Sequence, residues 1–170
     1  MSKTKMGNMN GESKQSEKNK SDEEGPVFLV AVDFSHCSKL ALKKAKDLLE
    51  RWGGKIVVFH VIDHDFVEQC VQGQLGKKGD IKKKLFIGAK AKLQEFVLKE
   101  GLEGEQIENV VCEGSPCLEI NKKAAEIDAE MIVIGSQGKS EDMKSIFFGS
   151  TAERVLRFIT RPVLCVPPKI

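Results

Sequence analysis

The sequence predicts an α/β fold, in which a doubly wound, five-stranded parallel sheet carries helices on both faces. Short apolar runs rich in Val and Ile alternate with longer segments whose apolar residues recur at helical spacing. Such runs are typical of strands that are buried on both faces of a parallel sheet and joined by right-handed crossovers. The length of 170 residues favours one domain, which we place at residues 25–170.

Residues 1–24 differ in composition from the rest of the chain. They are rich in Ser, Lys, Glu, Asn and Gly, and their large apolar side chains are all Met. A segment of this composition buries too little apolar surface to offset the conformational entropy lost on ordering. We therefore expect a disordered tail before the domain.

The first part of the domain has two strong strand signals with a helix between them. VFLVAVD (27–33) and KIVVFHVID (55–63) are apolar runs that each end in Asp. Ser35 is a suitable N-cap for the intervening helix, and Gly53-Gly54 is a suitable end. The apolar face of that helix consists of Ala41, Ala45, Leu48, Leu49 and Trp52.

The middle of the chain is less regular. Residues 64–80 show no clear period and contain three glycines, so we expect a loop. A long helix should follow and end at Gly101, and QIENVVCEG (106–114) predicts a weaker strand nearer a sheet edge. The apolar face of the long helix consists of Phe86, Ala89, Leu93, Phe96 and Val97.

The last part of the chain predicts two more helices and two more strands. Ser115-Pro116 marks a helix start, because Ser is a good N-cap and Pro suits the first helical position. EMIVIG (130–135) predicts a buried strand, and RPVLCVP (161–167) predicts a last strand with Pro162 at an unpaired position. The two helices have the apolar residues Cys117, Ile120, Ala124 and Ile127, and Ala152, Val155, Leu156 and Ile159.

Composition argues against several classes of function. A formal net charge of +2 gives no strong field for nucleic acid or for an anionic membrane. The eight Lys from Lys77 to Lys99 are interpreted as a solvated helix face, so we expect no nucleic-acid partner. The chain has no apolar run long enough for a membrane span and no secretory signal at its N-terminus. We therefore expect a cytoplasmic protein without a membrane partner.

The number and spacing of Cys and His argue against disulfides and metal sites. The five Cys are odd in number and form no CxxC pair, which favours reduced thiols over a disulfide framework or a zinc site. The three His lack the spacing of a helical metal motif. We expect no metal site built from protein side chains.

The segment GSQGKSEDMKSIFFGST (135–151) is the main candidate for a binding site. Ligands of such sheets bind beyond the carboxyl ends of the strands, where this segment joins the turns after Asp33 and Asp63. Its glycines let a ligand approach the backbone, and the helix start at Ser150 offers N–H and hydroxyl donors to an anion. Two interpretations remain open: the glycines only let the chain turn, or the loop holds a phosphate chain.

From Val27 to Val166 the sequence resembles the universal stress protein family. Nucleotide-binding members carry Gly, two residues, Gly, nine residues, Gly and then Ser or Thr, followed by a helix and an RPVLVV-like strand. This chain reads IVIGSQGKSEDMKSIFFGST and then RPVLCVP, and its VAVDFS and VFHVID resemble the first two strands of the family. Ten residues, 139–148, stand where the pattern has nine. The extra residue is either absorbed as a bulge or tilts the last helix start away from the site.

The resemblance implies the strand order 3-2-1-4-5 and a site for an adenine nucleotide, ATP or otherwise AMP or ADP. Asp33 would accept hydrogen bonds from the ribose hydroxyls, and Val61 or Ile62 would present backbone groups to the adenine. A divalent cation, Mg²⁺ or Mn²⁺, would be held through phosphate oxygens and water. The phosphates would be held by Gly135, Gly138, Gly149 and Ser150.

We therefore expect an ATP-binding regulatory protein of the stress response, acting through nucleotide-dependent conformation and contacts with an unidentified protein partner. The alternative is a family member that no longer binds nucleotide and acts as a protein-interaction dimer. The resemblance implies a homodimer through the last strand, residues 161–167. We assign no catalytic residue, because no general base or arginine finger is evident beside the expected γ-phosphate, and we expect at most slow ATP hydrolysis.

Overall fold

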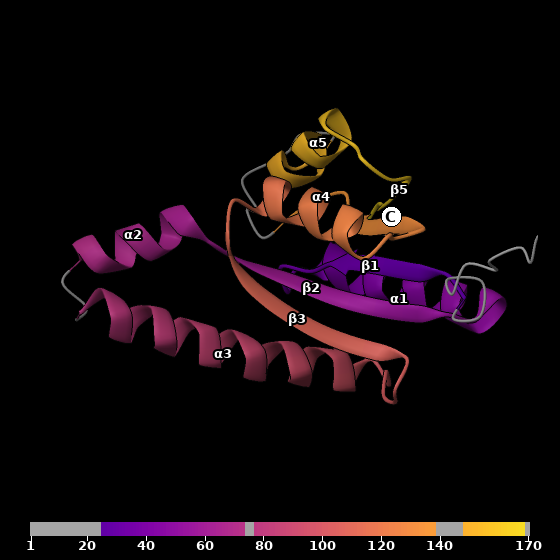
Figure 1. Cartoon of the computed structure of the whole chain (residues 1–170), viewed down its shortest axis with the longest axis horizontal. Coiled ribbons are helices and arrows are strands. Elements are labelled where there is room, and N and C mark those ends of the chain that lie inside the picture. The colour runs from indigo at the N-terminus through magenta and orange to yellow at the C-terminus, as the bar shows by residue number, and fades with distance from the viewer. Residues whose placement is uncertain (1–24, 74–76, 139–147, 169–170) are drawn as a thin grey trace, which may run out of the picture.

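A five-stranded parallel sheet in the order β3-β2-β1-β4-β5 lies at the centre of the molecule (Figure 1). The computed structural model describes residues 25–73, 77–138 and 148–168. The expected tail, residues 1–24, and most of the loop after Gly138, residues 139–147, lie outside the described residues. The strands are β1 Val27–Ala31, β2 Lys55–Asp63, β3 Ile107–Gly114, β4 Met131–Gly135 and β5 Val163–Val166.

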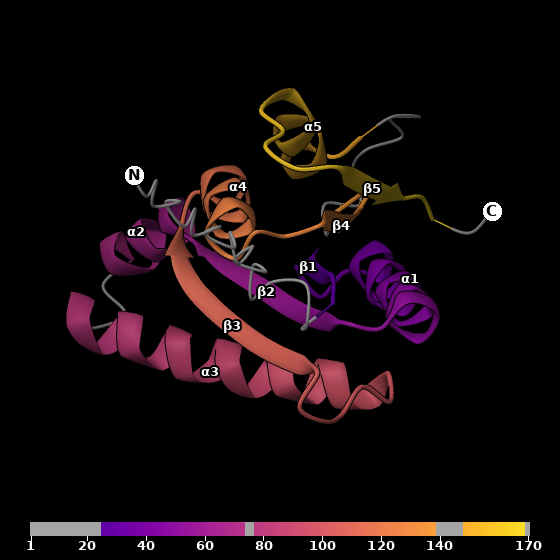
Figure 2. The same ribbon diagram turned by 45° about the vertical axis from the view of Figure 1, so that its right-hand side comes forward.

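Helices cover both faces of this sheet. In Figure 2, α4 and α5 lie on one side of the strands, and α1 and α3 lie on the other. The fold class and the strand order expected from the sequence are therefore confirmed. The helices are α1 His36–Trp52, α2 His64–Gln72, α3 Lys78–Lys99, α4 Pro116–Glu126 and α5 Ser150–Arg157.

Two apolar cores lie on the two faces of the sheet, because successive side chains of a strand point to opposite sides. In β1, Phe28 and Val30 pack with α1 and α3, whereas Leu29 and Ala31 pack with α4 and α5. All four of these side chains are buried. Because both faces of β1 are buried, its sequence VFLVA is apolar throughout and does not alternate between apolar and polar residues.

The prediction of a loop over residues 64–80 is wrong, because the segment contains α2 and the start of α3. Asp63 caps α2, since its side chain accepts a hydrogen bond from the N–H of Asp65 at 2.9 Å. Val67 is the buried residue of this nine-residue helix. One buried position in two and a half turns gives no repeat that a sequence pattern could reveal.

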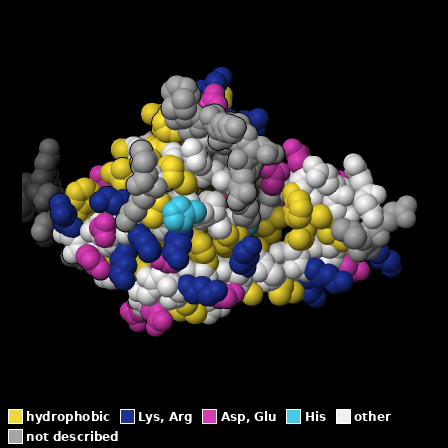
Figure 3. Space-filling view, turned by 180° about the vertical axis from the view of Figure 1, so that it is seen from behind, with side chains coloured by type: hydrophobic (Ala, Val, Ile, Leu, Met, Phe, Trp, Pro, Cys, Tyr) yellow, Lys and Arg dark blue, Asp and Glu magenta, His cyan; other side chains and the backbone are white. Residues whose placement is uncertain are grey.

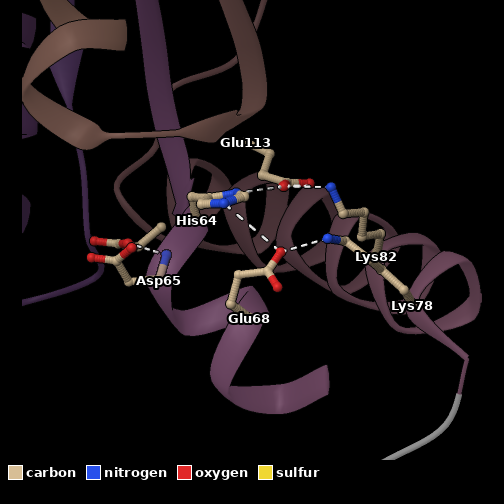
Figure 4. Close-up of polar contacts among 7 residues, drawn as sticks. His64, Asp65, Glu68, Lys78, Lys82 and Glu113 are labelled. Atoms are coloured by element: carbon tan, nitrogen blue, oxygen red, sulfur yellow. Dashed lines mark hydrogen bonds and ion pairs between the residues drawn. The ribbon is translucent and has the colours of Figure 1, made fainter. Parts of the chain in front are cut away.

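A network of ion pairs joins α2 to β3 and α3 (Figure 4). His64 Nδ1 lies 3.3 Å from Glu113 Oε1, and His64 Nε2 lies 3.8 Å from Glu68 Oε1. Lys82 and Lys78 lie 2.6 Å from the same two carboxylates, respectively. The hydrogen bond from Lys82 lowers the pKa of Glu113, and that from Lys78 lowers the pKa of Glu68. Both carboxylates are therefore ionised at neutral pH and tie the otherwise lightly packed α2 to the domain.

Three of the seven Lys in α3 lie in ion pairs with residues that the structure describes. Besides the two pairs in that network, Lys99 lies 2.6 Å from Glu95. Figure 3 shows Lys and Arg side chains next to Asp and Glu side chains on the face seen from behind. Within the described ranges, none of the helices is both long and apolar enough to cross a membrane.

The structure also corrects details at the ends of helices. Helix α5 ends at Arg157, so Ile159 lies outside it and is 57% exposed. Pro162 disfavours helical geometry in the residue before it, and the chain must straighten there to begin β5. Trp52 is 53% exposed, although its ring centroid lies 6.1 Å from that of Phe28. Ser115 makes no side-chain capping bond to α4, unlike Ser35, which accepts from the N–H of Ser38 at 3.1 Å.

Candidate functional site

A cavity of about 120 Å³ opens at the carboxyl edge of the sheet. This is far more than the roughly 10–15 Å³ that one water molecule needs. Its walls come from the ends of β1, β2 and β4 and from the first turns of α1, α4 and α5. The lining residues are Ala31, Val32, Asp33, Ser38, Phe59, Val61, Pro116, Ile120, Ile134, Gly135, Ser136, Gln137, Gly138, Gly149, Ser150, Thr151 and Ala152.

Six of the seven candidate residues from the sequence line this cavity, and Ile62 does not. Val61 packs on the core that lies on the cavity side of the sheet, whereas Ile62 is buried in the core on the opposite side. The family resemblance left both residues open, because either could present backbone groups to the adenine, and that expectation stays a prediction. Strand alternation places Val61 in the wall and turns the Ile62 side chain away.

The two ends of the glycine loop lie side by side. The N–H of Gly149 donates to the carbonyl oxygen of Ser136 at 2.7 Å. A Cβ on Gly149 would lie 3.3 Å from the nitrogen of Gly138, which leaves little room for any side chain. The ten-residue spacing thus begins and ends at neighbouring points of the cavity wall. The segment in which the extra residue would be absorbed, residues 139–147, lies outside the described residues, so both alternatives for it stay predictions.

The start of α5 faces the cavity without a side-chain cap. Gly149 is the N-cap residue and provides no side-chain oxygen, and Ser150, Thr151 and Ala152 all line the cavity. The first N–H groups of a helix have no acceptor within the helix and carry the positive end of its dipole. An anion placed here would gain hydrogen bonds from the backbone and from the Ser150 and Thr151 hydroxyls.

Asp33 is the only charged side chain among the described lining residues. Its Oδ1 accepts a hydrogen bond from the N–H of Ser35 at 2.9 Å. Its Oδ2 lies 3.1 Å from the position that a Cβ on Gly138 would take. A ligand hydroxyl can donate to this carboxylate, but a phosphate beside it would be repelled. The arrangement therefore separates a site for hydroxyl groups from the donors at the start of α5.

Gly135 serves the packing of α1 more directly than it serves a ligand. A Cβ at this position would lie 2.7 Å from both the carbonyl carbon and the Cβ of Cys37. Real Cβ atoms essentially never approach so closely, so only glycine lets the first turn of α1 lie against the end of β4. The phosphate contact expected of Gly135 stays a prediction, and its contact with Cys37 could not be predicted from spacing.

Other lining residues escaped the sequence analysis. Ser38 in α1 and Phe59 in β2 were not singled out, and Pro116 and Ile120 were considered only as helix positions. Phe59, Pro116 and Ile120, together with Val61, give the cavity an apolar part. Of these, Pro116 has a signal in the sequence, because it lies two residues after the carboxyl end of β3.

Cys112 and Cys165 are not activated nucleophiles. All five cysteines are free thiols. Burial raises the pKa of Cys112 to about 11 and also raises the pKa of Cys165. Both thiols therefore stay protonated near neutral pH, where a nucleophilic cysteine would need a lowered pKa.

Comparison with known proteins gives consistent matches over the domain. Residues 27–167 match the model of the universal stress protein family. Universal stress protein MJ0577 of Methanocaldococcus jannaschii is 30% identical over 156 residues, covering 84% of this chain and 94% of that protein. The solved structure of MJ0577 has a TM-score of 0.72 at 28% identity and covers 85% of this chain and 97% of its own.

Two further relatives agree. Universal stress protein YxiE of Bacillus subtilis is 29% identical over 155 residues, covering 82% of this chain and 97% of that protein. The universal stress protein of Archaeoglobus fulgidus, solved in complex with dAMP, has a TM-score of 0.55 at 28% identity. That match covers 83% of this chain and 96% of the solved one.

Proposed function

This chain belongs to the universal stress protein family, and we propose that it acts as an adenine-nucleotide-binding regulatory protein of the stress response. ATP is the ligand we favour, with AMP and ADP as smaller members of the same class. In this proposal, bound nucleotide changes the surface around the start of α5, which a protein partner in the cytoplasm recognises. All five cysteines are free thiols, which is the state that the reducing cytoplasm favours.

One observation carries the proposal: the uncapped start of α5 and the carboxylate of Asp33 open into the same cavity. A nucleotide has both of the groups that these features would bind, namely an anionic phosphate chain and ribose hydroxyls. The apolar side formed by Phe59, Val61 and Ile120 suits a flat base. The relative solved with dAMP supports an adenine nucleotide as the ligand class.

The donor set favours binding over catalysis. The described lining residues contain no Lys, Arg or His that could stabilise charge on a transferring phosphoryl group. We therefore propose at most slow ATP hydrolysis. Among the residues that the structure describes, no cluster of three His, Cys, Asp or Glu could hold a metal ion. Mg²⁺ or Mn²⁺ would accordingly be held by the phosphate oxygens and water.

We expect the purified protein to release an adenine nucleotide on denaturation, or the nucleotide-free protein to bind ATP. The first is measured by mass spectrometry of the released small molecules, and the second by calorimetric titration. CTP is the matched control, since it has the same phosphate chain and sugar with a different base. Protein that carries no nucleotide and fails to bind millimolar ATP would contradict the proposal and favour the alternative without nucleotide.

We also propose that the chain forms a homodimer through its last strand. β5 is an edge strand of the sheet whose four residues are all only half-buried. Phe158 and Ile159, just before it, are 61% and 57% exposed. An exposed apolar edge is a liability for a monomer, and pairing with a second copy would cover it.

Ile159→Asp is expected to weaken this dimer, because it places a charge in the proposed contact. Sedimentation equilibrium measures the dissociation constant. Ile87→Asp is the matched control, because Ile87 on α3 is also 57% exposed and lies away from β5. A wild-type protein that remains monomeric at hundreds of micromolar would rule the dimer out.

A further inference from the structure

Phe34 has a backbone conformation that its side chain should disfavour. Its φ is +67°, in the left-handed region, and it is one of two such residues other than glycine in the described ranges. For a bulky residue this conformation costs on the order of 1–3 kcal/mol and persists only when the surroundings impose it. Phe34 directly follows Asp33, the charged residue of the cavity.

Among the described residues, His60, Phe96 and Lys92 contact the Phe34 ring on the face of the sheet opposite the cavity. The centroid of its ring lies 4.4 Å from that of His60 on β2 and 5.6 Å from that of Phe96 on α3. Lys92 Nζ lies 4.5 Å from the ring centroid. His60 also contacts the residue that follows β1, since its Nδ1 lies 2.8 Å from the carbonyl oxygen of Val32. These contacts are of the kinds that aromatic and cation–π pairs favour.

The turn from Asp33 to Ser35 links the packing of the Phe34 ring to the orientation of the Asp33 carboxylate. Asp33 and Phe34 are sequential, yet one lines the cavity and the other packs with the core under α3. The Ser35 N–H then binds Asp33 Oδ1 at 2.9 Å, and Ser35 Oγ accepts from Ser38 at the start of α1. The φ of Phe34 sets where the Ser35 N–H lies relative to Asp33. Contacts that hold the Phe34 backbone in this conformation therefore also hold the orientation of the Asp33 carboxylate.

We propose that Phe34 is a positioning residue for Asp33, and that the packing of α3 on Phe34 sets the affinity of the cavity for ribose hydroxyls. The inference rests on the proposed nucleotide site. The contacts of Phe34 with Phe96 and Lys92 make α3 the element through which events on the far face of the sheet change ribose recognition. Without the ring contacts, the turn relaxes out of the left-handed region and the carboxylate loses its direction.

The test compares ATP with 2′,3′-dideoxyadenosine triphosphate, which lacks both ribose hydroxyls. Phe34→Ala is expected to weaken ATP binding about 10-fold, the loss of one hydrogen bond to a charged group. The dideoxy ligand should lose less than about 2-fold, since it makes no bond to Asp33. Phe34→Tyr keeps the ring and should keep the affinity. In a double-mutant cycle, Phe34→Ala should cost little once Asp33→Ala is present.

Trp52→Ala is the matched control, because it removes an exposed aromatic contact at the other end of α1. It should change neither affinity. If Phe34→Ala fails to fold, Phe96→Leu trims the edge contact of Phe34 and should give a smaller loss with the same ribose selectivity. Equal losses for both ligands would overturn the positioning role alone. Wild-type protein that binds neither ligand would overturn the proposed function and this inference with it.

Discussion

Replacing Gly149 by valine is expected to reduce ATP affinity at least about 100-fold, a loss of roughly 2.7 kcal/mol. A Cβ at this position already lies 3.3 Å from the nitrogen of Gly138, 3.5 Å from Gln137 Cα and 3.5 Å from Ser136 O. The two methyl groups of valine would either fill the space beside the α5 start or push the loop ends apart. Both outcomes remove the donors proposed for the phosphates. Calorimetric titration with ATP measures the change.

The same substitution at Gly88 is the control for this prediction. Gly88 lies in α3, and a Cβ there would meet nothing within 4 Å. Gly88→Val should therefore leave ATP affinity unchanged, and circular dichroism should show both variants folded. ATP binding that survives in folded Gly149→Val protein would mean that the phosphates do not lie between Gly149 and Gly138.

The sequence was most informative where a residue type has one structural use. Buried parallel strands read as apolar runs, so all five strands were located from the sequence, and the lower apolar content of 106–114 indicated its place at a sheet edge. The strand order came from the family resemblance, because the order of parallel strands leaves no local signal. Ser35 could be identified as an N-cap because Ser before an apolar helical repeat is typical of that position. Its side chain accepts the capping hydrogen bond from the Ser38 N–H.

The sequence was least informative where a tertiary contact decides the structure. α2 is held by Val67 and by ion pairs from Lys78 and Glu113, which lie 11 and 46 residues further along the chain than Val67. Which of the Val61 and Ile62 side chains lines the cavity depends on which face of β2 meets α4, and no spacing rule fixes that. The strained φ of Phe34 depends on His60, Phe96 and Lys92, and a Phe between Asp and Ser does not suggest it.

The spacing of the glycine loop involves both a local sequence signal and a tertiary contact. Counting residues raises the question of whether Gly149 can still reach Gly138, and counting cannot answer it. The answer lies in the bond from Gly149 N–H to Ser136 O and in the close approach of Gly149 to Gly138. The two ends of the loop are therefore neighbours in this chain despite the ten-residue spacing.

Gly135→Ala is expected to destabilise the folded domain by about 1–3 kcal/mol, the usual cost of inserting a methyl group into a packed interior. The new Cβ would lie 2.7 Å from the Cys37 carbonyl carbon and Cβ and 2.9 Å from the Cys37 oxygen. Two of these atoms belong to the backbone of α1, so no side-chain rotation can relieve the contact. The first turn of α1 must move away from β4. Urea denaturation should show a lower midpoint with an unchanged slope.

Gly88→Ala should change stability in the opposite direction, which makes the comparison sharp. In an exposed helix interior with open space around it, alanine stabilises by about 0.5–1 kcal/mol relative to glycine. Both substitutions add the same methyl group and restrict the unfolded chain equally, so their difference reports the contact with Cys37. An equal shift in the two variants would mean that α1 does not lie against Gly135. The first turn of α1 and the end of β4 would then not form the cavity wall together in the way described above.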